Sequence, residues 1–223
     1  AKMAGDRIRK AIVDNGEARI IVATGASQFE FLEALVKEPG IDWTKVTGFH
    51  LDEYVGIPVS HKASFRGYMR ERFVSQTPQP LKVFNEVNGE AEDTDAEIAR
   101  LEALIRVAPI DVACIGFGEN GHIAFNEPGS SLTSRTRQKT LTTDTIIANS
   151  RFFDNDVNKV PKTALTVGVG TIMDAKEVLI MVNGHNKARA LQHAVEEPIS
   201  HMWTISALQM HQHGIIVADE AAC

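Results

Sequence analysis

An unbroken apolar stretch at residues 112–115 runs directly into a loop broken by glycines, and this transition constrains the fold more than any other part of the sequence. The stretch, VACI, is typical of a strand that is buried on both faces of a parallel sheet. We expect it to end at Gly116. Similar apolar stretches at 19–23 and 177–182 each lead through a glycine-containing turn into a segment with helical spacing. The repetition predicts an α/β fold with a mostly parallel central sheet.

The loop after residues 112–115 carries four polar side chains that suit chemistry. These are Glu119, Asn120, His122 and Glu127. In an open α/β sheet, ligands bind in the crevice beyond the carboxyl ends of the strands, so we interpret this loop as the floor of an active site. A lone histidine after a strand more often has a structural hydrogen-bonding role. The flanking glycines and carboxylates favour a catalytic role for His122.

The turn at Thr24–Ser27, TGAS, follows the first predicted strand and precedes a helical pattern. Backbone amides at such a turn point outward at the positive end of the helix dipole, where phosphate is a natural ligand. The hydroxyl groups of Thr24 and Ser27 would add two donors. These residues equally fit an ordinary helix N-cap at Ser27.

A predicted strand at 46–49 is followed closely by two adjacent acids, Asp52 and Glu53. Because neighbouring side chains face different directions, we expect at most one of them to line the crevice. The simpler alternative is that both are solvated loop acids.

The remaining segments are predicted from their periodicity. The range 162–171 is compatible with a starting helix turn, 202–208 with a helix and 215–218 with a late strand. Residues 134–166 are expected to form a mobile lid, because 130–139 is polar and 140–149 is rich in threonine, a poor helix former. Helical spacing is seen at 5–14, 29–37, 64–73, 95–105 and 188–195.

Composition restricts the class of protein. A chain of 223 residues with 43% hydrophobic residues fits one large α/β domain, and no repeat or linker divides residues 1–223. A net charge of −6 without a basic block argues against nucleic acid as a partner. The sequence has neither a run of about 18 apolar residues nor a leader-like pattern, so we expect no membrane partner and a cytoplasmic location. Both cysteines, Cys114 and Cys223, are expected to be free thiols.

Seven motifs in order resemble those of one family, glucosamine-6-phosphate deaminase, also called glucosamine-6-phosphate isomerase, within a group that includes 6-phosphogluconolactonase. The resemblance covers nearly the whole chain. Its motifs are TGAS, FHLDEYVGI, SFRGYMRERF, GFGENGHIAFNEPGSSLTSRTR, ANSRFFDNDVNKVPKTALTVGVGTIMDA, NKARAL and SHMWTISALQMH. The lactonase branch is similar in its GxGxxGH loop but is not expected to carry DEY, HIAFNEP or NSRFF.

The resemblance implies a Rossmann-like three-layer α/β/α sandwich and a reaction. Glucosamine 6-phosphate would be converted to fructose 6-phosphate and ammonia by ring opening and C2 proton abstraction, with no cofactor and no metal. It implies that Asp52 is the C2 base and that His122 opens the ring. Glu127 would hydrogen-bond to the second ring nitrogen of His122, and Asn120, which cannot titrate, would have a positioning role only. The implied phosphate-binding residues are Thr24, Gly25, Ala26, Ser27, Arg151 and Lys187.

Departures from the family pattern set further expectations. The turn reads GAS where many relatives carry a second glycine, and an N-terminal strand expected before residue 5 is absent from this sequence. Ser130, Arg137 and Lys139 match positions that bind an allosteric sugar phosphate in longer hexameric members. Because the sequence ends at Cys223, short of the C-terminal segment of those members, we expect a monomer or small homo-oligomer without allosteric activation.

Two other functions compete with deamination. A non-catalytic sugar-phosphate sensor would keep the pocket but would have no use for a base beside C2. A lactone hydrolase would also need no such base. Comparing substrates would separate these alternatives.

Overall fold

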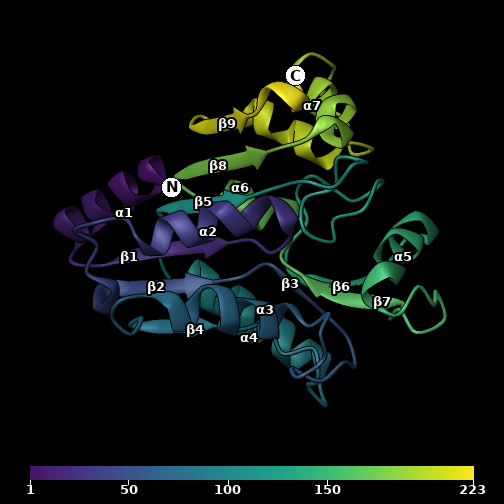
Figure 1. The fold of residues 1–223 in the computed structure, drawn as a ribbon, viewed down its shortest axis with the longest axis horizontal. Helices are drawn as coiled ribbons and strands as arrows, with labels where there is room; N and C mark the ends of the chain where they lie inside the picture. The colour runs from purple at the N-terminus through teal and green to yellow at the C-terminus, as the bar shows by residue number, and fades with distance from the viewer.

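Six parallel strands form the central sheet, in the order β4-β2-β1-β5-β8-β9 (Figure 1). The computed structural model describes all residues from 1 to 223. The strands are β1 (Ala18–Val22), β2 (Val46–Phe49), β4 (Val83–Asn85), β5 (Val112–Ile115), β8 (Glu177–Val182) and β9 (Gly214–Ala218). β1 and β8 flank β5, so the three predicted strand-to-turn transitions lie side by side.

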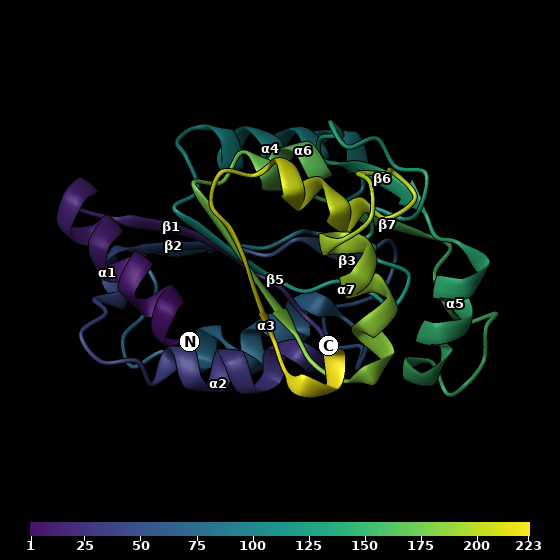
Figure 2. The same ribbon diagram turned by 90° about the horizontal axis from the view of Figure 1, so that it is seen from above.

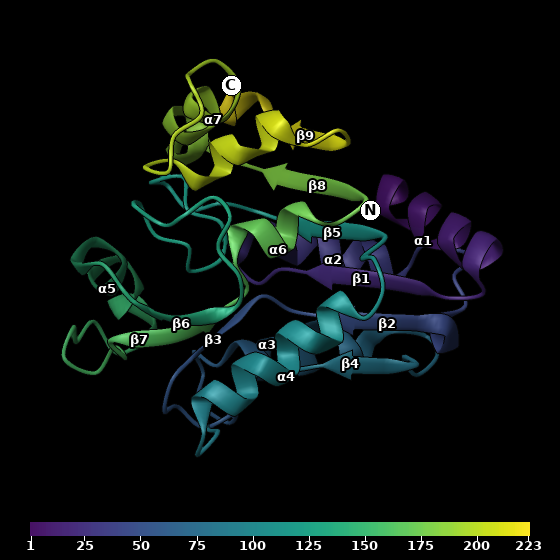
Figure 3. The same cartoon turned by 180° about the vertical axis from the view of Figure 1, so that it is seen from behind.

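Helices cover both faces of this sheet, which confirms the predicted three-layer α/β/α fold. Seen from above, α1, α2 and α3 lie on one side, and α4 and α6 on the other (Figure 2). The view from behind shows α4 and α6 in front of the sheet (Figure 3). The helices are α1 (Lys2–Asn15), α2 (Phe29–Val36), α3 (Phe65–Arg72), α4 (Thr94–Arg106), α5 (Thr143–Asn149), α6 (Val169–Met173) and α7 (Ala188–Val195).

Side chains alternate between the two faces of the central strands, and they pack into a hydrophobic core on each face of the sheet. In β1, Ile21 packs with residues of α4, α6 and α7, whereas Ile20 and Val22 pack with residues of α1, α2 and α3. In β5, Ala113 and Ile115 join the first of these two cores. Burial on both faces explains why these strands read as continuous apolar runs.

A second, antiparallel sheet lies beyond the carboxyl ends of the parallel strands. Its order is β3-β7-β6, from β3 (Asp52–Tyr54), β7 (Thr163–Thr166) and β6 (Arg137–Thr140). Figure 1 shows this sheet on the side toward which β8 points, with α5 further out. An apolar cluster that includes Tyr54, Phe125 and Phe153 lies against it.

Three predictions about this region are corrected by the structure. Asp52 and Glu53 lie in a strand and are buried, so they are not solvated loop acids. The range 162–171 begins with strand β7 rather than with a helix turn, because it pairs with β3 and β6. The threonine-rich segment forms a helix, α5, since Thr142 caps it by accepting a hydrogen bond from the Thr145 amide.

The other predicted elements agree with the structure within a few residues. The strands at 46–49, 112–115 and 177–182 and the helix at 188–195 are confirmed. The predicted helix at 202–208 is a 3₁₀ helix, η6 (Thr204–Met210). Both cysteines are free thiols, as predicted. No helix of this structure combines the length and the apolar character needed to span a membrane.

Candidate active site

Three loops at the carboxyl ends of β1, β5 and β8 contact one another and form the floor of the candidate site. A Cβ atom placed on Gly116 would lie 3.0 Å from the Ser27 hydroxyl oxygen, which shows how closely the first two loops approach. On the other side, Lys187 Nζ donates to the Phe117 carbonyl at 2.8 Å. Asn186 Nδ2 donates to Glu119 Oε1 at 3.1 Å. The loops therefore form one continuous surface.

The first loop has the geometry of an anion cradle. Gly25, with φ of 111°, precedes a short 3₁₀ helix, η1 (Ala26–Gln28), that leads into α2. The backbone N–H groups of Ala26 and Ser27 donate to no acceptor within the protein. Tyr68 fixes the turn from outside by donating its hydroxyl proton to the Gly25 carbonyl at 3.1 Å. These two free amides lie at the N-terminal end of a helix, which is the positive end of its dipole, where an anion is stabilised.

Ser27 does not act as a helix N-cap, which was the alternative interpretation of this turn. Gly25 is the N-cap of η1 and Gln28 that of α2, and neither makes a side-chain capping bond. The Ser27 hydroxyl instead accepts a hydrogen bond from Gln28 Nε2 at 3.2 Å. Its own proton thus remains available for a ligand. Thr24, the other predicted donor, is partly buried and its side chain makes no hydrogen bond within the protein.

His122 is held by the loop in a defined orientation and tautomer. Its ring packs on Gly118, where an added Cβ would lie 2.2 Å from Cε1. Nδ1 lies 2.5 Å from Asn120 Oδ1. Because an amide oxygen can only accept, Nδ1 carries the proton and Nε2 keeps its lone pair. Burial and the positive charge of Lys187 lower the pKa of His122, against the opposing effect of Glu127, so the imidazole is neutral at neutral pH.

Gly121 allows this loop to close. Its φ is 75°, and a Cβ here would lie 2.5 Å from the ring of Trp203. Ile205 and Thr204 of η6 also bond to the loop, since Ile205 N donates to the Gly121 carbonyl at 2.9 Å and Thr204 Oγ1 accepts from Ile123 N at 3.2 Å. A larger residue at position 121 would be strained in its backbone and would displace the indole.

Glu127 lies near His122 but does not hydrogen-bond to it, in contrast to the prediction. The closest approach, from Oε2 to Nδ1, is 4.0 Å. Thr142 Oγ1 donates to the same Oε2 at 3.3 Å, and Oε1 has no partner. The carboxylate is 1% exposed, so it acts on His122 through its charge. Asn120, and not Glu127, fixes the imidazole.

Asp52 reaches the site from the second sheet. It pairs with Thr166 of β7, and Thr166 Oγ1 accepts a hydrogen bond from Phe125 N in the His122 loop at 3.1 Å. The Asp52 carboxylate, 7% exposed, accepts no hydrogen bond and forms no ion pair. Burial, together with the charge of Glu53, raises the pKa of Asp52 to about 8. A desolvated carboxylate without donors is a stronger base than an exposed one.

Lys187 and Arg151 provide two positive charges, and neither forms an ion pair with a carboxylate. Arg151 lies in the 3₁₀ helix η4 (Ser150–Phe152), with its guanidinium 4.9 Å from the centre of the Phe152 ring. Burial lowers the pKa of Lys187, and the positive charge of Arg151 lowers it further, while Glu119 opposes both. Two cations that repel each other and have no ion-pair partner suit an anionic ligand.

Several residues that support this site were not predicted from the sequence. Thr166 connects Asp52 to the His122 loop, Gln28 orients Ser27, and Thr142 holds Glu127. Neither Thr142 nor Thr166 stands next to a predicted site residue, and the hydrogen bond between Thr166 and Phe125 spans 41 positions in the chain. Only Gln28, adjacent to Ser27, carried a sequence signal. The structure contains no group of three or more His, Cys, Asp or Glu side chains that could hold a metal ion.

Comparisons with known proteins place the chain among sugar-phosphate enzymes. A family model described as glucosamine-6-phosphate isomerases/6-phosphogluconolactonase matches residues 1–217. Glucosamine-6-phosphate deaminase of Phocaeicola vulgatus is 60% identical over 203 residues, which cover 89% of this chain and 77% of the relative. The deaminase of Porphyromonas gingivalis is 52% identical over 226 residues, covering 98% of this chain and 85% of the relative.

Solved structures agree with these relatives. A monomeric glucosamine-6-phosphate deaminase superimposes with a TM-score of 0.89 and 32% identity, covering 99% of this chain and 91% of that one. A 6-phosphogluconolactonase from Shewanella baltica has a TM-score of 0.76 at 17% identity, covering 97% of this chain and 89% of that one, which shows a shared fold. The chain therefore belongs to the family of glucosamine-6-phosphate isomerases and 6-phosphogluconolactonases.

Proposed function

We propose that this protein is a glucosamine-6-phosphate deaminase, which converts glucosamine 6-phosphate and water into fructose 6-phosphate and ammonia. The observation that carries this assignment is the environment of Asp52. It is a buried carboxylate, free of hydrogen bonds and with a pKa of about 8, on a strand tied to the His122 loop. Such a group suits removal of a proton from carbon. The named relatives at 52% to 60% identity support the same activity.

The phosphate of the substrate would bind between the first turn and the two cations. The turn offers the amides of Ala26 and Ser27 and the Ser27 hydroxyl, with Thr24 beside them. Lys187 and Arg151 supply positive charge against a dianion. Fixing this end of the sugar would use binding energy to hold the reacting carbons in place.

His122 would open the sugar ring. With its proton on Nδ1, its Nε2 atom can take the proton of the anomeric hydroxyl group and return a proton to the ring oxygen. Asn120 keeps the tautomer that this transfer needs. Glu127 would stabilise the transient imidazolium, because its buried negative charge lies 4.0 Å from Nδ1.

Asp52 would then move the proton that defines the reaction. As a carboxylate it takes the C2 proton of the open-chain aldehyde, while O1 takes a proton from the C2 ammonium group, which gives an enolamine with O1 protonated. Return of the proton to C1 leaves a protonated imine at C2. Water adds there and ammonia leaves, which produces the ketose. A general base of this kind contributes roughly 10²- to 10⁴-fold in rate.

The segment 134–166 fits the role of a lid within a single domain of residues 1–223. It carries Arg151 and covers the apolar cluster around Tyr54. Its two ends, β6 and β7, are held by the pairing of β7 with β3. Between them, the segment is connected to the rest of the site by contacts such as Thr142 with Glu127 and Asn149 with the Tyr54 hydroxyl at 2.8 Å. We assign the chain a monomeric or small oligomeric state, in line with the monomeric deaminase that it resembles.

Lactone hydrolysis is the competing activity, because the family includes lactonases. That reaction breaks an ester bond and needs no base beside C2. One assay separates the two: ammonia and fructose 6-phosphate are measured from glucosamine 6-phosphate, beside hydrolysis of 6-phosphogluconolactone. We expect the first activity to dominate. Loss of C2 proton exchange in deuterated water in Asp52→Asn, with sugar-phosphate binding kept, would assign the base. Hydrolysis of the lactone without release of ammonia would refute the proposal.

A further inference from the structure

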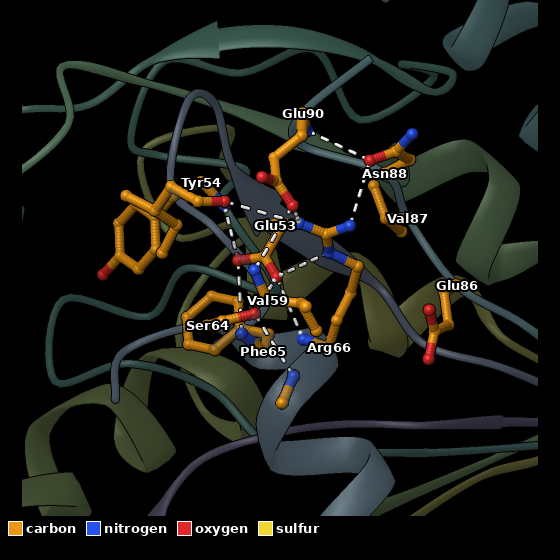
Figure 4. Close-up of polar contacts among 12 residues, drawn as sticks. Glu53, Tyr54, Val59, Ser64, Phe65, Arg66, Glu86, Val87, Asn88 and Glu90 are labelled. Carbon is orange, nitrogen blue, oxygen red and sulfur yellow. Dashed lines mark hydrogen bonds and ion pairs between the residues drawn. The ribbon is translucent and has the colours of Figure 1, made fainter. Parts of the chain in front are cut away.

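Glu53, the neighbour of Asp52, lies at the centre of a buried hydrogen-bond network (Figure 4). It is 0% exposed and accepts from five donors. The Ser64 hydroxyl donates at 2.7 Å, and the amides of Tyr54, Phe65 and Arg66 donate at 2.9, 3.2 and 3.0 Å. The fifth donor is Nε of Arg66 at 3.4 Å. Three of these donors stand at the N-terminal end of α3, where a carboxylate is stabilised.

The guanidinium group of Arg66 donates hydrogen bonds from all three of its nitrogen atoms. It is 6% exposed, and its Nη1 atom donates to Asn88 Oδ1 at 3.0 Å. Its Nη2 atom donates to Glu90 Oε2 at 2.7 Å and to the Ile57 carbonyl at 3.4 Å. Figure 4 shows the guanidinium between Glu53 and Glu90. The planar group thus fixes one carboxylate that is completely buried and a second that is partly exposed.

Asp52 differs from Glu53 in every respect that matters for a base. Along the extended backbone the two side chains leave on opposite faces of β3, and all five donors are on the Glu53 side. Asp52 is also held by sheet pairing, because it lies opposite Thr166 of β7. Its backbone is therefore held by this pairing and by the anchored Glu53 next to it, while its carboxylate has no donor.

We propose, on the basis of the proposed deaminase function, that Glu53 with its counter-ion Arg66 is a positioning pair that keeps Asp52 available as the base. Glu53 accepts from these five donors, and the lone pairs of Asp52 stay free for the C2 proton of a sugar phosphate. The negative charge of its carboxylate, one residue away, strengthens Asp52 as a proton acceptor. Arg66 limits this effect because its positive charge partly compensates that of Glu53.

The charged and titratable groups around Asp52 determine the direction in which its pKa should shift when one of them is replaced. Its own chain segment carries Glu53, Tyr54 and His50, whose pKa burial lowers to about 3, so that it stays neutral. On β7 the facing residue is Thr166, which does not titrate. Arg137 of β6 pairs with the far side of Thr166 and donates to Asn126 Oδ1. Glu53 is thus the acidic group next to Asp52, and Arg66 is the positive charge paired with Glu53.

Opposite shifts of the pH profile test the proposal. In Glu53→Gln, a negative charge beside Asp52 is lost, so the acid limb of kcat/KM should move to lower pH, with kcat falling about tenfold and KM little changed. In Arg66→Gln, the compensating positive charge is lost, so the limb should move to higher pH. Glu53 keeps four of its five donors in that variant, which favours folding even if Glu53→Gln is unstable. Glu90→Gln is the matched control. It also removes a partner of Arg66, but away from Asp52, so the acid limb of kcat/KM should stay at the wild-type pH.

A direct measurement separates this inference from the proposed function. The ¹³C signal of the Asp52 carboxyl group can be titrated in the wild type and in each variant without any turnover. We expect its midpoint to move down in Glu53→Gln and up in Arg66→Gln. Equal midpoints and unmoved acid limbs in all variants would show that Glu53 and Arg66 only brace the fold, even in an active deaminase. A wild type that titrates as expected but releases no ammonia would instead refute the deaminase assignment alone.

Discussion

The Oδ1 atom of Asn120 lies 2.5 Å from Nδ1 of His122, so a side chain that cannot titrate sets the tautomer of the imidazole. Glu127, at 4.0 Å from the same nitrogen, contributes its charge without a hydrogen bond. This division suggests why His122 is neutral although a carboxylate is near. Burial and Lys187 lower its pKa, and the acceptor at Nδ1 is an amide.

Replacing that amide by a carboxylate should therefore change the pH dependence. In Asn120→Asp, a negative charge next to Nδ1 favours the imidazolium and raises the pKa of His122. Since ring opening needs the neutral ring, the ionisation of His122 should appear in the kcat profile at a lower pH than that of Asp52, and it should move to higher pH in this variant. The measurement is a pH profile from 5 to 10. Asn183→Asp, an exposed site in the neighbouring loop, is the control for added charge. A profile identical to that of the wild type would show that Asn120 has no influence on His122.

The Asp52 carboxylate should cost the protein stability at high pH. Its pKa rises from 3.8 to about 8 on folding, so the folded protein binds this proton more tightly than the unfolded chain. The resulting stabilisation is present below about pH 3.8 and is lost as the pH rises to about 8. Asn mimics the protonated acid. We expect Asp52→Asn to be inactive but more stable than the wild type, by up to a few kcal/mol at pH 8.5 and by much less at pH 4.5.

Thermal or urea unfolding at the two pH values measures this difference. Glu92→Gln, an exposed loop position, is the matched carboxyl-to-amide control and should change little at either pH. A stability difference between Asp52→Asn and the wild type that is the same at both pH values would contradict the raised pKa.

Lys187→Ala and Arg151→Ala should each weaken recognition of the phosphate. A charge-assisted hydrogen bond to a dianion contributes about 1.5 to 3 kcal/mol, so KM should rise roughly 10- to 100-fold. Preference for glucosamine 6-phosphate over glucosamine, and inhibition by inorganic phosphate, should fall in parallel. Lys2→Ala, in α1 on the opposite side of the molecule, serves as the control for lost charge. If both variants keep the wild-type preference for the phosphorylated sugar, neither cation contacts the phosphate.

The sequence predicted the part of the site whose residues are close together in the chain. His122 and Asn120 are two positions apart, and the strand before them could be recognised from its apolar run, so their proximity needed no tertiary information. The same holds for the turn at Gly25. The parallel sheet follows from local patterns because a strand buried on both faces differs clearly from its surroundings.

The second sheet could not be predicted in this way. β3 has only three residues, and its strand conformation depends on pairing with β7, more than 100 positions later. The prediction that Glu127 hydrogen-bonds to His122, where the structure has Asn120 instead, was wrong for a similar reason. Glu127 Oε2 bonds to Thr142, the cap of a helix in a segment where threonine content argued against helix. Tertiary contacts overrode local propensity in both places.

The last prediction concerns regulation: we expect hyperbolic kinetics and no activation by N-acetylglucosamine 6-phosphate. The family resemblance assigns three residues, Ser130, Arg137 and Lys139, to an effector site, but two of them are not available here. The Ser130 side chain is buried at 2% exposure, and Arg137 Nη1 already donates to Asn126 Oδ1 at 2.9 Å and to the Arg135 carbonyl at 3.2 Å. Of the three, only Lys139 is a cation whose side chain makes no hydrogen bond within the protein. An effector can activate only if it binds one of two global states more tightly. It would first have to expose Ser130 and break the two hydrogen bonds of Arg137. Rates measured across substrate concentrations, with and without the acetylated sugar phosphate and beside a sizing experiment, test this. A sigmoidal curve that the effector makes hyperbolic would show that Ser130 becomes exposed and that Arg137 exchanges its partners for a ligand.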